Sequence, residues 1–354
     1  MKKLFLAPII CMAALSSADS LKPAAWVPLP AVGSSPETGF QYGAYVMRIF
    51  EQTSADQPQD RLELLLQGTT QGQYQAYIWP NMFLDGGLWN LKGKLGGRYW
   101  PSGYFGQGNA TEEEADQYAN TTLEGSITAN YLITPDIRIG ASLRVENHEI
   151  EDIADPDGSE SSLIDANVIG ANGGLYSGVG AELIYDKRDN IDWPTQGNLS
   201  KATWDLYPTS LGSDANFSLL NARSAHYFSI ADDVFAFSAQ LSLASEDTPF
   251  THLPRPSGDG TLRGANGQRW IDNASVGAQA EFRKAISNRW AAVVFTDTFQ
   301  VASDLDQFAL SDFHYSIGGG IRFATTPDRF NVRLDVGFVD FESFNFAITV
   351  GEAF

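Results

Sequence analysis

The sequence predicts an all-β fold: a transmembrane antiparallel β-barrel of about 16 strands. Three observations lead to this prediction: a strict period of two near the end of the chain, an export signal at its start, and polar connections that alternate between short and long. Every second residue over 344–350 is large and apolar, and those between are small or polar. This period places one set of side chains on each face of a strand, so that one face can meet lipid and the other the lumen.

The end of the chain continues this pattern. Phe346 and Ile348 belong to the apolar set, Gly351 follows, and the last residue, Phe354, is aromatic. A terminal aromatic residue on an amphipathic strand is typical of bacterial outer-membrane barrels. We therefore interpret these four residues as a C-terminal barrel signal on a last strand over 344–354.

The N-terminus predicts export to the outer membrane. Lys2 and Lys3 precede an apolar stretch over 4–15, and Ser16 and Ala18 fit a small-residue cleavage site. Because this stretch is too short to span a bilayer, residues 1–18 are interpreted as a signal peptide. The only cysteine lies inside it, so disulfide and thiol chemistry are not expected in the mature barrel, residues 19–354.

Composition and charge exclude one class of partner. The mean hydropathy of −0.18 fits a barrel whose strands are only half apolar. The formal charge of −20, which becomes −22 without the two lysines of the signal peptide, argues against nucleic acid, because that partner needs a basic face. Acidic runs over 112–116 and 149–152 are interpreted as solvated surface, with cation bridging to lipopolysaccharide as the alternative.

Strand, turn, strand is the repeating unit of the mature chain. The predicted strands cover 26–32, 40–50, 61–67, 74–82, 89–98, 121–132, 137–146, 175–185, 199–206, 217–228, 234–243, 275–286, 290–300, 314–323, 330–339 and 344–354. Tight turns such as 134–136 and 287–288 alternate with long polar segments near 100–120, 147–173, 244–273 and 301–312. This sorting is expected of short periplasmic turns and longer external loops, with both termini on the periplasmic side.

Charged residues within these strands indicate the lumen face. A charge on the lipid face near the bilayer midplane costs about 2–4 kcal/mol for Lys or Arg. The strand patterns around them place four such residues inward: Glu281, Arg283, Arg333 and Asp335. About 20 residues separate the cleavage site from the first long strand, so no second domain is expected.

The segment Gly258-Asp259-Gly260-Thr261-Leu262-Arg263-Gly264-Ala265 resembles the Leu/Val-Arg-Gly-aromatic motif of the Omp-85 superfamily, which includes BamA, TamA and the two-partner-secretion transporters. The resemblance implies that this long late loop folds into the lumen. It also implies that Arg263, between Leu262 and Gly264, docks on inner-wall Glu281 and Asp297. The period-two alternation of apolar residues is enough to place Glu281 on the lumen face. The alternation does not decide which face Asp297 lies on, and the free-energy cost of a carboxylate in lipid favours the lumen face.

Further motifs extend the resemblance over most of the chain. Residues 185–197 are similar to the family's Asp-x-Arg-Asp…Pro…Gly turn, and 318–323 to its glycine-rich third-last strand. Two departures, Ala265 for the aromatic residue and Phe299 for a glycine, predict a less tightly seated loop. With no room for POTRA modules, the chain resembles the POTRA-less branch. That branch implies insertion or translocation of protein or lipid clients, with a possible separate periplasmic partner.

Catalysis and metal binding are not expected. The four histidines are His148, His226, His252 and His314, and none is spaced from another as a metal-ligand pair. Asp312 and His314 are the only close aspartate–histidine pair in the sequence, and no Gly-x-Ser-x-Gly motif occurs. We therefore expect no enzyme, no cofactor and no metal, and histidines scattered over the surface or the aromatic girdles.

Two other functions stay open at this point. A passive, acidic, cation-preferring porin would also have about 16 strands, but it would constrict its pore with a loop from its early half. A structural or adhesive barrel would present its acidic loops, and its late loop would be dispensable. All three contact lipid and lipopolysaccharide and need the barrel-assembly machinery for their own insertion. A first strand containing Pro28 and Pro30, followed by Pro36, predicts a weak seam with the last strand.

Overall fold

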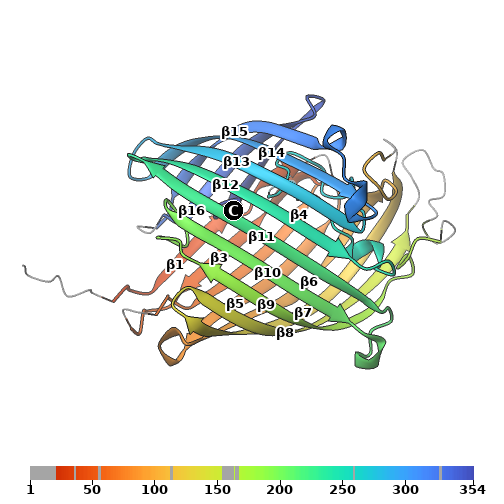
Figure 1. Cartoon of the computed structure of the whole chain (residues 1–354), viewed down its shortest axis with the longest axis horizontal. Helices are drawn as coiled ribbons and strands as arrows, with labels where there is room; N and C mark the ends of the chain where they lie inside the picture. Colours follow the sequence, from red (N-terminus) through yellow and green to blue (C-terminus); the bar gives the residue numbers. More distant parts are fainter. Residues whose placement is uncertain are drawn as a thin grey trace, which may run out of the picture.

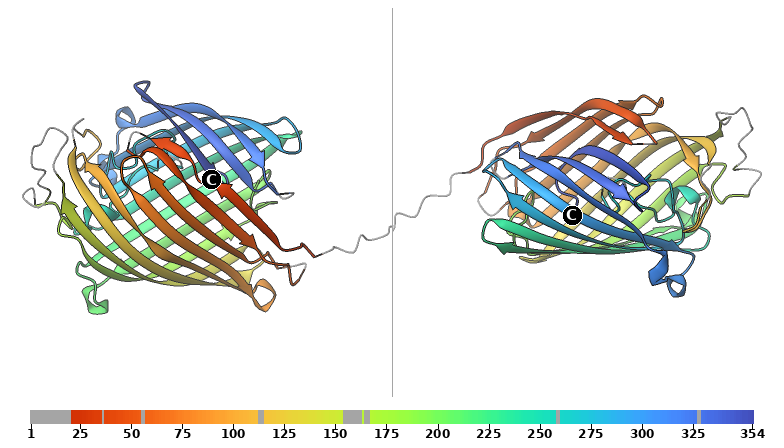
Figure 2. Two further views of the ribbon diagram at one scale, coloured as in Figure 1. Left: turned by 180° about the vertical axis from the view of Figure 1, so that it is seen from behind. Right: turned by 90° about the horizontal axis from the view of Figure 1, so that it is seen from above.

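The computed structural model describes residues 21–35, 37–54, 57–111, 115–153, 163, 167–257, 260–326 and 329–354. The signal peptide over 1–18, Pro36, the acidic residues 112–114 and the loop residues Gly258 and Asp259 lie outside the described residues. The described chain forms one antiparallel sheet of 17 strands that curves around a lumen (Figures 1 and 2). The predicted all-β barrel fold is confirmed.

Short turns and loops join the strands, and the few helices are single 3-10 turns of three residues each. None of the described helices is long and apolar enough to cross a membrane. The strands are β1 (Ala25–Pro30), β2 (Gly33–Ser35), β3 (Gly39–Ile49), β4 (Arg61–Thr69), β5 (Tyr74–Leu84), β6 (Trp89–Tyr104), β7 (Asp116–Thr134), β8 (Ile137–Asp152), β9 (Gly174–Asp186), β10 (Gly197–Tyr207), β11 (Phe217–Ile230), β12 (Asp233–Ala244), β13 (Ala274–Ala285), β14 (Trp290–Ala302), β15 (His314–Ala324), β16 (Asn331–Val339) and β17 (Ser343–Val350).

Sequential strands are neighbours throughout the sheet, and the strand order places β17 beside β2. Both β1 and β2 pair with β3, with Ala25 opposite Ile49 and Gly33 opposite Gln41. They lie in line along one edge of β3 and form a single interrupted strand. Counting them as one turns the 17 strands into 16, the number expected from the sequence.

The inner and outer faces differ in chemistry along each late strand. On β16, Arg333 and Asp335 are buried toward the lumen, whereas Phe338 is 48% exposed on the outside. Exposed apolar side chains of this kind recur around the barrel: Leu66, Leu95, Leu123, Ile127, Leu143, Leu183, Val294, Ile317 and Phe344. An apolar exterior with a polar interior is the pattern of a barrel that meets lipid.

Three neighbouring strands extend five or six residues beyond a predicted end. The sequence placed strand ends at 98, 121 and 146, but β6 continues to Tyr104, β7 begins at Asp116 and β8 ends at Asp152. The extensions pair with one another, as Tyr104 does with Asp116 and Tyr118 with Asp152. Apolar alternation reports contact with lipid and not hydrogen bonding, so it ends where the bilayer ends while the ladder continues.

The end of the chain corrects a prediction. The last strand was expected to run to Phe354, but β17 ends at Val350 and Gly351 adopts φ +75°. The chain then turns inward. The Glu352 carboxylate accepts hydrogen bonds from inner-wall Arg322 (2.9 Å) and Asn331 (2.8 Å), and Phe354 is buried inside the barrel, where Figure 1 marks the C-terminus. A glycine tolerates this backbone conformation, and the buried charges of the wall pair with the carboxylate.

Candidate functional site: the late loop in the lumen

The late loop, residues 245–273, connects β12 to β13 and folds back into the lumen (Figure 2). Leu262 and Arg263 at its tip are 0% and 1% exposed. A guanidinium with so little access to water needs full pairing, because the cost of removing a charge from water is several kcal/mol.

Arg263 receives this pairing from two carboxylates. Its backbone N–H and its Nε donate to Asp297 Oδ2 at 3.0 and 2.9 Å, and its Nη2 donates to Asp297 Oδ1 at 2.8 Å. Its Nη1 donates to Glu281 Oε2. The guanidinium carbon lies 3.5 Å from the centroid of the Phe295 ring, a cation–π contact. The structure thus brings Arg263, Glu281 and Asp297 together, with a bidentate pair that fixes the orientation of the arginine.

The inner face of β14 is unusual in carrying aromatic residues beside a carboxylate. Phe295, Asp297 and Phe299 are all buried on the lumen side, while Val294 is 59% exposed outside. Phe295 supports the guanidinium of Arg263, and Phe299 packs in a cluster with Leu262. Period-two counting left Asp297 open because its neighbours on that face are aromatic. They face the lumen because the loop covers them there.

Arg263 is one member of a larger charge network. Glu281 also accepts from Arg283 Nε (2.7 Å) and Arg322 Nη2 (3.3 Å). The second half of the network links Asp335 with Arg322 at 2.6 Å and Arg333 at 3.1 Å. In total, the network joins four arginines with four carboxylates. The arginines are Arg263, Arg283, Arg322 and Arg333, and the carboxylates are those of Glu281, Asp297, Asp335 and Glu352. Their formal charges cancel, which is what a partly dry lumen requires.

Two members of this network were not anticipated from the sequence. Arg322 follows the outward Ile321 on β15, so the rule that placed Arg283 inward could have found it. Glu352 carried no such signal, because the chain beyond Val350 was expected to continue as a strand.

The backbone of the loop tip lies directly on the barrel wall. Gly264 adopts φ +96°, and a Cβ atom there would lie 2.6 Å from the carbonyl oxygen of Gly337 on β16. The Ser316 hydroxyl donates to the Arg263 carbonyl, and the Asn345 amide donates to that of Gly264. The tip therefore contacts β15, β16 and β17 through its main chain as well as β13 and β14 through its side chains.

Apolar contacts complete the seat of the loop. Leu262, Ala265, Trp270, Phe299 and Val301 form a buried cluster with Val339. The two departures from the family pattern, Ala265 and Phe299, both lie in it. Trp270, an aromatic residue of the loop in the same cluster as Ala265, also stacks on His314, with ring centroids 3.7 Å apart.

At the opposite end of the barrel, the turn between β9 and β10 is closed by hydrogen bonds to one carboxylate. Asp189 accepts from the Thr195 backbone (2.8 Å) and hydroxyl (2.5 Å) and from the Gln196 backbone (3.1 Å). Burial raises the pKa of the Asp189 carboxyl, but these hydrogen bonds outweigh it and hold that pKa below its usual value.

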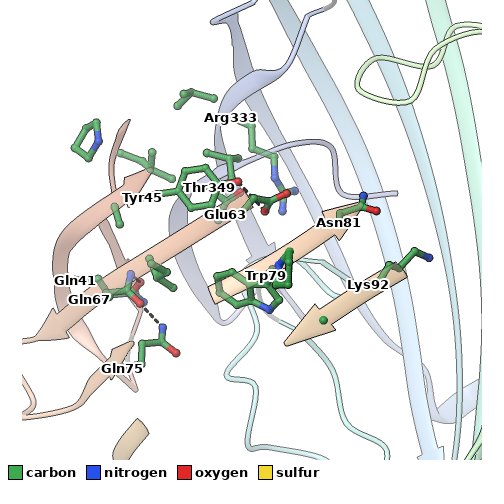
Figure 3. Close-up of a pocket in the computed structure, with 18 of the residues that line it drawn as sticks. Gln41, Tyr45, Glu63, Gln67, Gln75, Trp79, Asn81, Lys92, Arg333 and Thr349 are labelled. Carbon is green, nitrogen blue, oxygen red and sulfur yellow. Dashed lines mark hydrogen bonds between the residues drawn. The ribbon is translucent and has the colours of Figure 1, made fainter. Parts of the chain in front are cut away.

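A cavity of about 730 Å³ opens on the lumen side between the first strands and the last strand (Figure 3). Pro30 and Ala31, at the break between β1 and β2, line it together with Ile348, Thr349 and Val350 of β17. Its other wall is polar, with hydrogen-bonded amides of Gln41, Gln67 and Gln75 beside Glu63, Lys92 and Arg333. The cavity thus adjoins the place where the barrel closes.

Comparison with known proteins agrees with this architecture. The Omp85 superfamily domain matches residues 67–354. The structure of BamA from Haemophilus ducreyi lacking POTRA domains 1-3 is similar with a TM-score of 0.61 and 15% identity, over 92% of this chain and 70% of that chain. CdiB from Acinetobacter baumannii is similar with a TM-score of 0.58 and 11% identity, over 93% of this chain and 60% of that chain, less than two thirds of its length. These likenesses show the fold, and the domain match shows the family. The chain belongs to the Omp85 superfamily of outer-membrane β-barrels, the family that its Leu262-Arg263-Gly264 segment resembles.

Proposed function

We propose that this protein takes part in the insertion or translocation of protein or lipid clients at the outer membrane, and that its late loop keeps the lumen closed. The buried pairing of Arg263 with Glu281 and Asp297 carries the proposal. A passive porin needs an open pore with separated acidic and basic walls. Here the charges around the loop tip are joined in one network of four arginines and four carboxylates, and the tip lies among them.

The seam between the first and last strands is the proposed place for a client strand. The neighbour of β17 in the sheet is β2, which has 3 residues, whereas β16 pairs with β17 over 8 residue pairs. A short strand interrupted beside Pro30 leaves part of the last strand with few backbone partners, and unpaired edges recruit other strands. The cavity of Figure 3, with one apolar and one polar wall, gives such a strand room on the lumen side.

Hydrogen exchange measures this seam. In the refolded barrel, amides of residues 343–350 on the β2 side are expected to exchange faster than those of β12 and β13, which are paired on both edges. Equally slow exchange at both places would mean a firm seam and would remove the proposed client site.

The other partners follow from the membrane setting. The outer face is proposed to contact lipid and the acidic loops to contact lipopolysaccharide, with a periplasmic protein delivering the client. Residues 1–18 are proposed to direct export, with cleavage near Ala18, leaving 19–354 as the barrel. No catalytic step is proposed.

Single-channel conductance of the refolded barrel tests the closed lumen. The wild type is expected to show small, irregular openings, and Arg263→Ala to show large ones, because the variant removes the contacts that hold the loop tip. Arg289→Ala is the control, since Arg289 lies exposed in the turn after β13 and should leave conductance unchanged.

Two results would redirect the interpretation. Large, steady and identical openings of wild type and Arg263→Ala would indicate a cation-preferring porin. A closed Arg263→Ala barrel would show that the Arg263 contacts are dispensable for closure, which favours a structural or adhesive barrel.

A further inference from the structure

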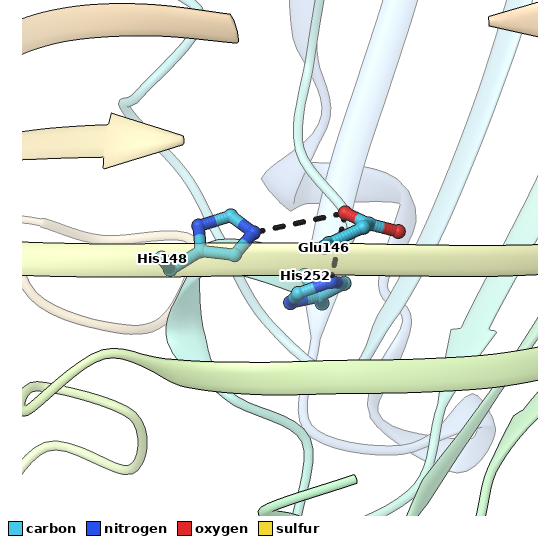
Figure 4. A group of neighbouring side chains, drawn as sticks. All are labelled: Glu146, His148 and His252. Atoms are coloured by element: carbon cyan, nitrogen blue, oxygen red, sulfur yellow. Dashed lines mark ion pairs between the residues drawn. The ribbon is translucent and has the colours of Figure 1, made fainter. Parts of the chain in front are cut away.

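The late loop has a second attachment on another part of the barrel wall. Its short 3-10 turn η3 (Phe250–His252) places His252 against Glu146 and His148 of β8 (Figure 4). The Nε2 atoms of His252 and His148 lie 3.4 and 3.6 Å from Glu146 Oε2. The expectation of scattered histidines is wrong for these two, which are far apart in the sequence and adjacent in the lumen.

In all three side chains, the nitrogen or oxygen atom that points away from the centre of the cluster has a hydrogen-bond partner. His252 Nδ1 is 2.9 Å from the Thr251 hydroxyl, and His148 Nδ1 is 3.1 Å from the Asn120 amide. Glu146 Oε1 accepts from the Tyr207 hydroxyl at 3.0 Å. Outer partners on the remote nitrogen and oxygen are the arrangement that orients metal ligands.

The two nitrogen atoms that point toward the centre of the cluster, Nε2 of His148 and of His252, have no such hydrogen-bond partner among the described residues. The His148 and His252 side chains are 4% and 7% exposed. The three ligand atoms, including Glu146 Oε2, lie within 4.8 Å of one another. Distances of 3.4 and 3.6 Å are long for hydrogen bonds to a carboxylate. Zinc–ligand bonds of about 2.0–2.1 Å place neighbouring ligands of a tetrahedron about 3.3–3.4 Å apart.

We propose that Glu146, His148 and His252 bind a divalent transition-metal ion, Zn²⁺ in the first place, which fastens the late loop to β8. Two imidazoles and one carboxylate leave a fourth position open, and a water molecule fits there because a cavity of about 330 Å³ adjoins the three side chains. The Asn120 amide can present its oxygen to His148 Nδ1 after a half-turn, so both imidazoles can carry their proton on Nδ1.

The charges around the cavity are compatible with a cation. Lys94, on its wall, is paired with Glu124 at 2.6 Å. Arg98 adds one further positive charge, which favours hydroxide or another anion as the fourth ligand.

Metal titration of the refolded, tag-free barrel tests the proposal. After treatment with EDTA, the wild type is expected to bind one equivalent of Zn²⁺, and Co²⁺ is expected to give the visible absorption of a tetrahedral site. His148→Ala and His252→Ala should each lose this binding at least tenfold. His226→Ala is the control, because His226 is exposed on β11 and should bind like the wild type.

Folding of each variant is checked by its heat-dependent mobility in gels, and His148→Gln or His252→Gln replaces the alanine variant at the same position where that variant does not fold. A wild type that binds neither ion, or His148 and His252 variants that bind as well as the wild type, would overturn the site. The cluster would then be a set of histidine–carboxylate contacts without a metal ion.

Discussion

The two attachments of the late loop satisfy their polar atoms in different ways. Around Arg263, the guanidinium, the backbone N–H and the neighbouring carbonyls all have partners on the barrel wall. Around His252, aromatic rings supply most of the contact: Tyr176 and Phe217 have ring centroids 5.0 Å from the imidazole, and its Nε2 has no hydrogen bond to any described residue. At the first attachment, protein groups satisfy the polar atoms of Arg263. At the second, the two imidazole Nε2 atoms stay available to bind a ligand.

Breaking the first attachment should have the largest effect. Asp297→Ala leaves Arg263 with Glu281 and the more distant Asp335 (3.9 Å), and removing one partner of a buried ion pair costs about 3–5 kcal/mol. Urea unfolding in detergent should show this loss in the free energy of unfolding.

Two further variants complete this measurement. Combining Asp297→Ala with Arg263→Ala should cost less than the sum of the single changes, since no unpaired partner is left between them. Asp306→Ala, on an exposed loop, should stay within about 0.5 kcal/mol of the wild type. A cost for Asp297→Ala as small as that of Asp306→Ala would mean that Arg263 is solvated in the lumen.

A smaller change sharpens the second attachment. Tyr207→Phe removes the hydroxyl that donates to Glu146 Oε1, and loss of such an outer partner typically lowers metal affinity about 10–100-fold. Without metal, the same variant should lose only about 1 kcal/mol of stability. Calorimetric titration with Zn²⁺ measures the first effect, and Tyr315→Phe, on the outer face, is the control. Unchanged Zn²⁺ affinity in Tyr207→Phe would show that Glu146 is not a ligand.

The sequence was most informative where the membrane constrains it. Lipid forces an apolar outer face, so alternation located the strands, and the cost of a charge in lipid placed Glu281 and Arg283 on the inside. It was less informative where the chain leaves the bilayer, as in the extensions of β6 to β8 and the inward turn at Gly351.

The histidine cluster illustrates why the rest could not be predicted. His148 lies on β8 and His252 on the late loop, so no local spacing connects them. Their approach depends on how the loop crosses the lumen, which follows from packing of Phe250 against Tyr104 and Tyr118. Such long-range contacts leave no period in a single sequence.

The distance along the chain between the two attachments has a further consequence. His252 and Arg263 are close in the sequence of the late loop, but they bind different strands of the barrel, β8 and β14. In terms of multivalency, the loop is an intramolecular bidentate ligand of its own lumen. When one attachment dissociates, the other keeps the released residue near its partners on the wall, at an effective concentration of about millimolar or more. Single releases of the wild-type loop are therefore short, whereas Arg263→Ala leaves the loop tip permanently without its contacts on the barrel wall.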